Sequence, residues 1–419
     1  MFLLNLGYQW RFTEEVEGAV FLPTGNTCPR LLRSPLPEFK RVLLDPQLYL
    51  AGLNAADCRL VCARLASYPW FGVSNLPEFD SSSRKQREWE KEMQDLVAPQ
   101  WPGSPPADME LACFRAIEIQ LQISCTQIIL PSPLIRERED EAQTQVMWLD
   151  AGIAVAQELQ VGQPLLATVA VHEATLNEAA FSSGGFLDTV VDQVTAREGL
   201  EGVYIVIIQD EAGHPFESSG QVQSAYYYLS SAFSGRGYGT VLTNFADVFG
   251  LVCLGSGATG VASGSSQSLR RMALAGFREE GGGIALPRLY SHKLTAELAT
   301  EADLDRIVQA KLLRRVSDLS PHSDTLMQTL ASGGSASQLQ PWAESRSNVS
   351  TAHRHFIYRM ATEEKSLMRL GMADRKERIE TWLEDAAANF LYVSNRLPGG
   401  PLVGTAAPTG TWLELVTRA

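Results

Sequence analysis

The chain has 419 residues, of which 45% are hydrophobic and 20% charged, and its formal net charge is −13. The length accommodates one barrel of roughly 250 residues with additions. The acidic balance argues against general binding of nucleic acid or anionic membranes by the whole surface. No apolar run approaches the roughly 18 residues of a membrane span. Together with six scattered cysteines, this predicts a cytoplasmic protein without membrane contact.

The N-terminal third predicts a hairpin and an insertion. Two strand-like runs, Phe2–Trp10 and Ala19–Leu22, flank an acidic turn, which indicates an N-terminal hairpin. Further on, Ser81–Val97 and Asp108–Ser124 have helical patterns and flank a proline-rich connector. We therefore expect a helical insertion over about 80–124, after the second strand of the main repeat.

From residue 41 to residue 286, short apolar runs alternate with helical patterns, and Gly202–Ile208 is the clearest buried strand. Counting these units gives eight predicted strands, near residues 41, 69, 126, 164, 202, 239, 258 and 283. Short apolar strands that alternate with helices indicate a parallel α/β sheet, and eight of them favour closure into a (β/α)8 barrel of the TIM type. An open, doubly wound sheet is the alternative.

Residues 295–395 show no further strand pattern. They contain four helical stretches, Glu301–Leu319, Thr325–Trp342, Asn348–Arg369 and Arg375–Tyr392. The Pro-, Gly- and Thr-rich tail that follows includes one strand-like run, Trp412–Val416. We therefore expect a barrel over 1–294, including the insertion, and a helical C-terminal appendage over 295–419.

In a parallel barrel, the functional site lies at the carboxyl ends of the strands. The predicted catalytic residues at these ends are Asp45, His172, Glu173 and Asp210. His172 can act as a general base oriented by a carboxylate, whereas Asp45 and Asp210 together suit glycosyl transfer or hydrolysis. The structural alternative is that these side chains only satisfy backbone groups at strand ends and turns.

A second group of residues predicts an anion site. Small residues precede a predicted helix, Gln267–Phe277, and barrels often bind phosphate after their last two strands. The predicted anion- or substrate-binding residues are Asn244, Gly264, Ser265, Ser266, Arg270 and Arg288. The structural alternative is a tight turn whose small residues only allow close packing.

The same region contains a literal G-x-G-x-x-G, Gly255–Gly260, and Glu279 and Glu280 follow at about the spacing of the dinucleotide-binding fingerprint. In that fingerprint, a helix begins within the motif, whereas Val261–Ser266 is small and turn-like. The sequence therefore favours an anion site over a dinucleotide site. No cofactor is predicted, although the carboxylates at the strand ends could hold Mg²⁺.

Basic and aromatic residues interleave in Ser345–Arg359, within a segment, Arg306–Arg378, that has twelve Lys or Arg and seven Asp or Glu. This pattern predicts contact with a partner protein or nucleic acid through 345–378. The structural alternative is a solvated face that pairs with the acidic barrel.

Two functions follow from these patterns. The leading one is a soluble barrel enzyme, a transferase or hydrolase, that acts on a phosphorylated or otherwise anionic small molecule or nucleotide by acid–base chemistry. The other is a non-catalytic barrel that serves as an interaction module through its basic C-terminal helices.

Overall fold

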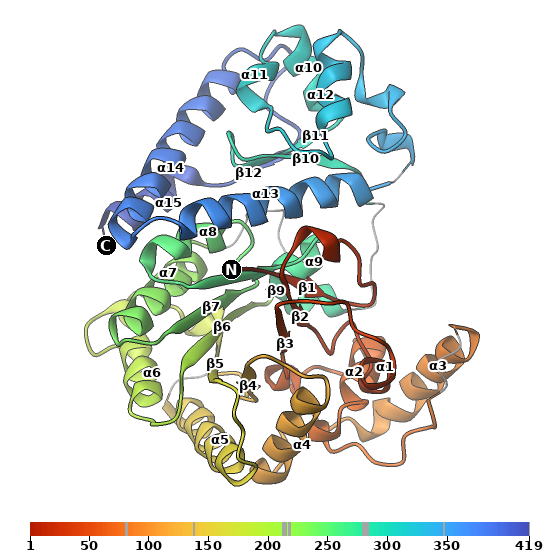
Figure 1. Ribbon diagram of the computed structural model, residues 1–419, viewed down its shortest axis with the longest axis vertical. Coiled ribbons are helices and arrows are strands. Elements are labelled where there is room, and N and C mark those ends of the chain that lie inside the picture. Colours follow the sequence, from red (N-terminus) through yellow and green to blue (C-terminus); the bar gives the residue numbers. More distant parts are fainter. Residues whose placement is uncertain are drawn as a thin grey trace.

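The computed structural model describes residues 1–79, 83–136, 139–211, 216, 219–278, 285–346 and 348–418. Figure 1 shows a barrel in the lower half of the molecule and a C-terminal appendage above it. Within the described ranges, no helix has both the length and the apolar character to cross a membrane.

Eight parallel strands form the barrel in the described part of the chain. They are β1 (Phe2–Leu6), β2 (Gly18–Phe21), β3 (Arg41–Leu44), β4 (Ile128–Leu130), β5 (Leu165–His172), β6 (Gly202–Gln209), β7 (Thr240–Asn244) and β8 (Gly260–Ser263). Their order in the sheet is β3-β2-β1-β8-β7-β6-β5-β4. The two ends of this order meet where the Thr126 N–H donates to the Val42 carbonyl at 2.9 Å. The predicted (β/α)8 barrel is confirmed.

Helices cover the outside of the barrel (Figure 1). They are α1 (Cys28–Arg33), α2 (Arg59–Ala66), α3 (Ser83–Gln100), α4 (Met109–Gln122), α5 (Glu139–Glu158), α6 (Phe186–Thr195), α7 (Gly220–Gly235) and α8 (Phe249–Cys253). Every residue of β5 and β6 is buried, because the barrel interior covers one face of each strand and helices cover the other.

The predicted N-terminal hairpin is wrong. β1 and β2 pair in parallel, with Leu4 opposite Ala19, and they are the first two strands of the barrel. Parallel strands usually need a helical crossover, but here the connection contains only one 3-10 turn, Thr13–Glu15. This short connection is what made the two runs look like a hairpin.

Two other predicted strands match no barrel strand among the described residues. The run near residue 69 is a 3-10 turn, Pro69–Phe71, so the α3–α4 insertion follows the third barrel strand and not the second. In the run near residue 283, positions 283 and 284 lie outside the described residues, and the next strand, β10 (Arg288–Ser291), is antiparallel and separate from the barrel. The count of eight agrees because the prediction has the runs near residues 69 and 283 where the structure has β1 and β2.

The appendage is not purely helical. β10 pairs with β11 (Ala296–Ala299), which pairs with β12 (Thr405–Ala406), and together they form a three-stranded sheet. Of these strands, β11 lies within 295–395, the range that shows no strand pattern in the sequence. The helices of the appendage are α10 (Ala302–Gln309), α11 (Leu313–Val316), α12 (Asp324–Ala331), α13 (Ser350–Met368), α14 (Met372–Ser394) and α15 (Thr409–Arg418). The strand predicted at Trp412–Val416 is therefore wrong, because it lies within α15.

Helix α13 lies across the junction between the appendage and the barrel (Figure 1). It packs on β1 and on the 3-10 turn that replaces the missing crossover helix between β1 and β2. Phe356 of α13, Trp382 of α14 and Trp412 of α15 belong to the same hydrophobic core as the barrel. A second core contains Leu289, Leu298 and neighbouring residues of the appendage. The division at residue 294 stays a prediction, but the last three helices share the core of the barrel.

The predicted helix Gln267–Phe277 is only partly helical. α9 (Gln267–Arg270) is followed by β9 (Met272–Ala273) and a 3-10 turn, Leu274–Phe277. β9 pairs with the end of β6, Met272 lying opposite Ile208. We call Gln267–Phe277 the cap segment, because it runs from the end of β8 to the end of β6 across the mouth of the barrel.

Candidate functional site

The predicted site residues that the structure brings together fall into three groups. Asp45 and Asn244 meet inside the barrel, His172, Glu173 and Asp210 meet at the ends of β5 and β6, and Ser266, Arg270 and Arg288 line a pocket at the junction with the appendage. The three groups differ in geometry and in the chemistry that they could perform.

The first group is a hydrogen-bonded network inside the barrel. The Tyr204 hydroxyl donates to Asp45 Oδ2 at 2.8 Å and accepts a hydrogen bond from the Asn244 amide. The Asn5 amide in turn donates to Asn244 Oδ1 at 2.7 Å. Because β3 and β6 are not neighbours in the sheet, the contact between Asp45 and Tyr204 crosses the barrel interior.

Asp45 is fully buried and accepts three hydrogen bonds. The Tyr49 hydroxyl donates to it at 2.6 Å and the Gln47 backbone N–H at 2.9 Å, in addition to Tyr204. Burial raises the pKa of Asp45 from 3.8 to about 6, although the three donors oppose this shift. Burial also raises the pKa of Tyr49 and of Tyr204 well above 10, so both hydroxyls stay protonated donors. Asp45 therefore links elements inside the barrel and does not face solvent.

The second group contains the predicted histidine. The Ala174 N–H donates to His172 Nδ1 at 3.3 Å, which leaves the proton on Nε2, and Nε2 lies 3.2 Å from Asp210 Oδ1. The Asp210 N–H donates to Glu173 Oε1 at 2.7 Å. His172 is buried, whereas the side chain of Asp210 is 62% exposed. The group thus presents one exposed carboxylate, held by a buried imidazole.

The cap segment covers the barrel network. The Asn5 amide donates to the Leu269 carbonyl at 2.9 Å, and the Ala275 N–H donates to the Asp210 carbonyl at 2.9 Å. Gly264 makes this path possible, since a Cβ there would lie 2.0 Å from the Leu269 Cβ. The structural alternative for Gly264 is therefore supported: its small size allows close packing.

Backbone strain gathers in the loops beside this network. Gln47, Phe245 and Asp247 have φ values of 50°, 62° and 50°, which non-glycine residues rarely adopt. Gln47 follows β3, and the other two follow β7. Strain of this kind persists only where the surroundings enforce it, and it is concentrated at functional sites.

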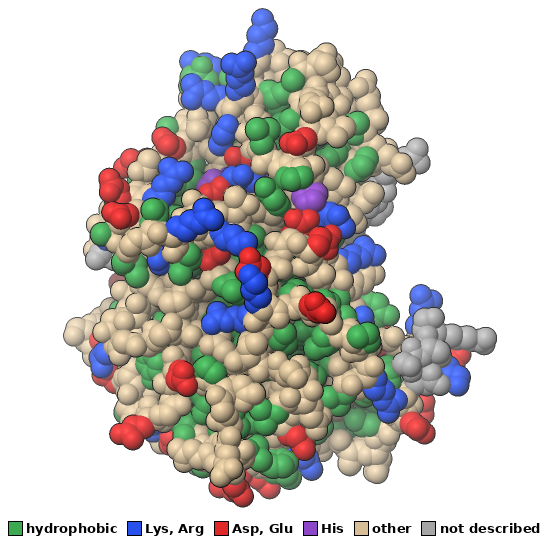
Figure 2. Space-filling view, viewed as in Figure 1, with side chains coloured by type: hydrophobic (Ala, Val, Ile, Leu, Met, Phe, Trp, Pro, Cys, Tyr) green, Lys and Arg blue, Asp and Glu red, His purple; other side chains and the backbone are tan. Residues whose placement is uncertain are grey.

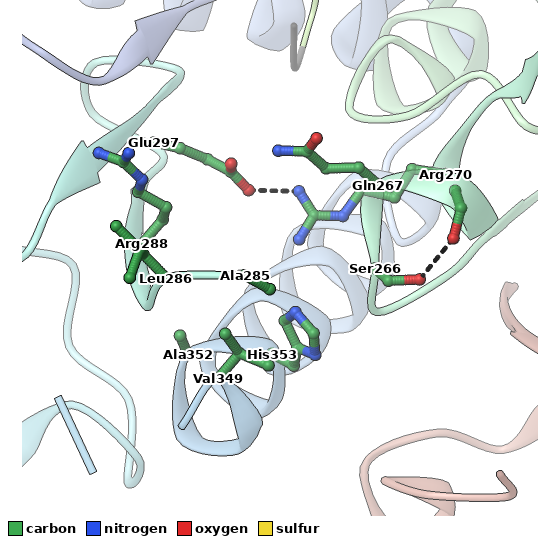
Figure 3. Close-up of a pocket in the computed structure, with 11 residues that line it drawn as sticks. Ser266, Gln267, Arg270, Ala285, Leu286, Arg288, Glu297, Val349, Ala352 and His353 are labelled. Carbon is green, nitrogen blue, oxygen red and sulfur yellow. Dashed lines mark hydrogen bonds and ion pairs between the residues drawn. The ribbon is translucent and has the colours of Figure 1, made fainter. Parts of the chain in front are cut away.

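The third group lines a pocket of about 490 Å³, which we call the junction pocket. Its lining residues are Ser266, Gln267, Ser268, Arg270, Ala285, Leu286, Arg288, Glu297, Val349, Ala352 and His353. They come from the cap segment and Ser266 before it, from β10 and β11 with the residues before β10, and from α13 and Val349 before it (Figure 3). Three of the six predicted anion-binding residues thus lie in one cavity, and Ser265 contributes its carbonyl, which accepts from Arg270 at 3.1 Å.

Arg270 forms an ion pair with Glu297 in this pocket, and both side chains are buried (Figure 3). The guanidinium carbon of Arg270 also lies 3.4 Å from the centre of the Phe356 ring on α13. These contacts fix the orientation of Arg270 and neutralise its charge. Helix α9 is a single turn, so the positive groups of the predicted anion site are arginine side chains and not a helix N-terminus.

Arg288 is the second guanidinium of the pocket. Its Nη1 atom is buried and has no hydrogen-bond partner among the described residues. A buried N–H without an acceptor is costly, so this guanidinium gains from any acceptor group that reaches it.

His353 lines the pocket from α13 (Figure 3). Burial, together with the nearby charges of Arg270 and Arg11, lowers its pKa from 6.5 to about 4. The ring is therefore neutral at neutral pH.

The basic stretch of the C-terminal helices makes contacts within the chain. On the face shown in Figure 2, Lys and Arg side chains gather over the appendage and the junction. Arg354 pairs with Glu14 at 2.7 Å, and Arg359 pairs with Glu363. These ion pairs favour the structural alternative for this stretch, and partner contact through 345–378 stays a prediction.

The remaining motifs act in packing. Gly257 of the G-x-G-x-x-G run has a φ of 114° and lies against Ser234, while Glu279 and Glu280 lie outside the described residues.

Among the residues that the structure describes, no group of three or more His, Cys, Asp or Glu is arranged to hold a metal ion.

Sequence reasoning missed Tyr204, Glu297 and His353 as site residues. Tyr204 lies within the buried run Gly202–Ile208, and its hydroxyl, the polar group in an otherwise apolar run, is the feature that could have indicated a buried hydrogen bond. Glu297 and His353 reach the pocket only through the packing of the appendage, which no local pattern encodes.

Comparison with known proteins adds no family, because no protein-family model matches the chain and no curated protein matches it.

Proposed function

We propose that this protein binds an anionic small molecule in the junction pocket. The observation that carries the proposal is the buried Nη1 atom of Arg288, which lacks an acceptor among the described residues although it belongs to a residue lining a 490 Å³ cavity. Carboxylate and phosphate oxygens are the acceptors that a guanidinium fork binds best. Ser266 and Gln267 supply further polar groups in the same lining.

The acid–base half of the predicted function rests on other residues. Asp210 offers an exposed carboxylate beside His172, and the cap segment connects this group with the pocket, because it contributes both Arg270 and the Ala275 N–H that binds Asp210. We propose Asp210 as the proton-transferring group of a transferase or hydrolase whose anionic substrate extends from the pocket along the cap segment to Asp210, and His172 as the residue that positions it.

Isothermal titration calorimetry tests the binding proposal, with hexanoate and inorganic phosphate as probes. We expect saturable binding of at least one probe, and we expect Arg288→Gln to weaken it by about tenfold or more, since the charge-assisted hydrogen bonds are lost. Arg236→Gln is the matched control, because Arg236 is exposed, pairs with Asp192 and lies outside the pocket. Binding that is unchanged in Arg288→Gln would exclude the junction pocket as the site.

A further inference from the structure

The two sides of the junction pocket differ in polarity. Ala285, Leu286, Val349 and Ala352 form an apolar wall, which lies below the charged groups in Figure 3. Arg270, Glu297 and Gln267 lie on the other side. A ligand that fills this cavity therefore needs an apolar body as well as a polar head.

The charges of the lining sum to about one positive charge at neutral pH. Arg270 and Glu297 cancel each other as an ion pair, and His353 is neutral because its pKa is lowered to about 4. This leaves Arg288 as the one uncompensated charge among the described lining residues.

Charged groups also lie behind the lining. Asp247 is buried behind Arg270, where its N–H donates to the Arg270 carbonyl at 3.1 Å, and burial raises its pKa. The charge of Arg271 acts against this shift, because it lowers the pKa of Asp247. Arg11 acts on His353 from an exposed position, where solvent screens its charge.

We propose that Glu297 makes the junction pocket selective for a ligand with a single negative charge and an apolar body, a carboxylate being the simplest case. This inference rests on the proposed function and adds the charge class of the ligand. Arg288 can neutralise one negative charge, whereas the second charge of a phosphate monoester would face the buried carboxylate of Glu297. Glu297 is thus a specificity-determining residue that keeps Arg270 from attracting a dianion.

The first test compares two probes with the same chain and different heads on the unmodified protein. At pH 8, hexyl phosphate is a dianion and hexanoate a monoanion, and we expect calorimetry to give about tenfold tighter binding of hexanoate. At pH 5.5, where most hexyl phosphate has a single charge, the ratio of the two affinities should approach one. At pH 5.5 both probes carry mainly one negative charge, so protonation of His353 strengthens the binding of both equally and leaves the ratio of their affinities unchanged.

The second test removes the selecting charge. In Glu297→Gln at pH 8, the ratio of affinities should shift by about tenfold toward hexyl phosphate, because the free charge of Arg270 favours a dianion more than a monoanion. Glu414→Gln is the matched control, since it removes the same charge from an exposed position on α15. If Glu297→Gln fails to fold, the comparison of the two probes on the unmodified protein still decides the question.

The outcomes separate the two proposals. Equal affinity for both probes at pH 8, with both lost in Arg288→Gln, overturns selection by Glu297 and leaves anion binding in place. Failure of both probes to bind, or binding that Arg288→Gln does not weaken, overturns the proposed function itself.

Discussion

Arg270 and Glu297 form a buried ion pair that joins the barrel to the appendage. Arg270 lies in the cap segment after β8, whereas Glu297 lies on β11 of the appendage sheet. The pair therefore does two things. It connects two parts of the chain, and it sets the charge of the pocket between them.

Removal of one partner of this pair should be strongly destabilising. Glu297→Ala leaves a buried guanidinium without its carboxylate, and we expect a loss of about 3 kcal/mol in the free energy of unfolding. Arg270→Met combined with Glu297→Met should cost clearly less than the sum of the single changes, because no charge then stays uncompensated. Urea unfolding of the four proteins measures this coupling. The exposed pair Arg236–Asp192 is the control, with an expected coupling of about 1 kcal/mol or less.

Asp45 should make stability depend on pH between 4 and 6. Its pKa in the folded protein is about 6, against 3.8 normally, so the folded state holds a proton that the unfolded state has released. The free energy of unfolding should therefore fall as pH rises through this range, by about 3 kcal/mol from this group. The difference in stability between the protein and Asp45→Asn isolates the effect. A difference that does not change with pH would contradict the buried environment of Asp45.

Anion binding should strengthen as pH falls, through His353. A bound anion favours the protonated imidazole and raises the pKa of His353 from about 4, so binding takes up a proton. We expect severalfold tighter binding of hexane-1-sulfonate, which keeps one negative charge, at pH 5 than at pH 7. His353→Gln should bind with an affinity independent of pH. Proton uptake follows from titrations in two buffers with different ionisation enthalpies.

The last three helices should unfold together with the barrel. Trp412 of α15 is buried and lies edge-on against Phe249 of α8, with 5.2 Å between ring centres. Trp412→Ala should cost about 3–5 kcal/mol and lower the midpoint of the barrel's own thermal transition, because the two share one core. Thr417→Ala, an exposed change on the same helix, should have little effect. A separate early transition for α13–α15 would contradict the shared core.

Much of the barrel could be predicted because its central strands are long, apolar and buried on both faces, as in β5 and β6. The first two strands were misread because the short Thr13–Glu15 connection looks like a hairpin turn, and only the packing of α13 shows how a parallel pair can lack its crossover helix. That packing depends on contacts between residues far apart in the sequence, such as Arg354 and Glu14, which are 340 positions apart.

Part of the candidate site could also be predicted. The rule that sites lie at strand ends identified Asp45, Asn244 and Arg288, but it could not separate the barrel network from the junction pocket. Asn244 and Asp45 are connected through Tyr204, a residue inside a strand. Glu297 was missed because β11 is a short strand without a periodic pattern, in a region that otherwise predicts helices.

The most direct test of the account is a crystal structure of the protein with 6-bromohexanoate, in which anomalous scattering locates the bromine. We expect the carboxylate within hydrogen-bond distance of Arg288 and the bromine against the apolar wall that contains Leu286 and Val349. A ligand found elsewhere at full occupancy, with the junction pocket empty, would contradict the central claim that this pocket binds an anionic small molecule.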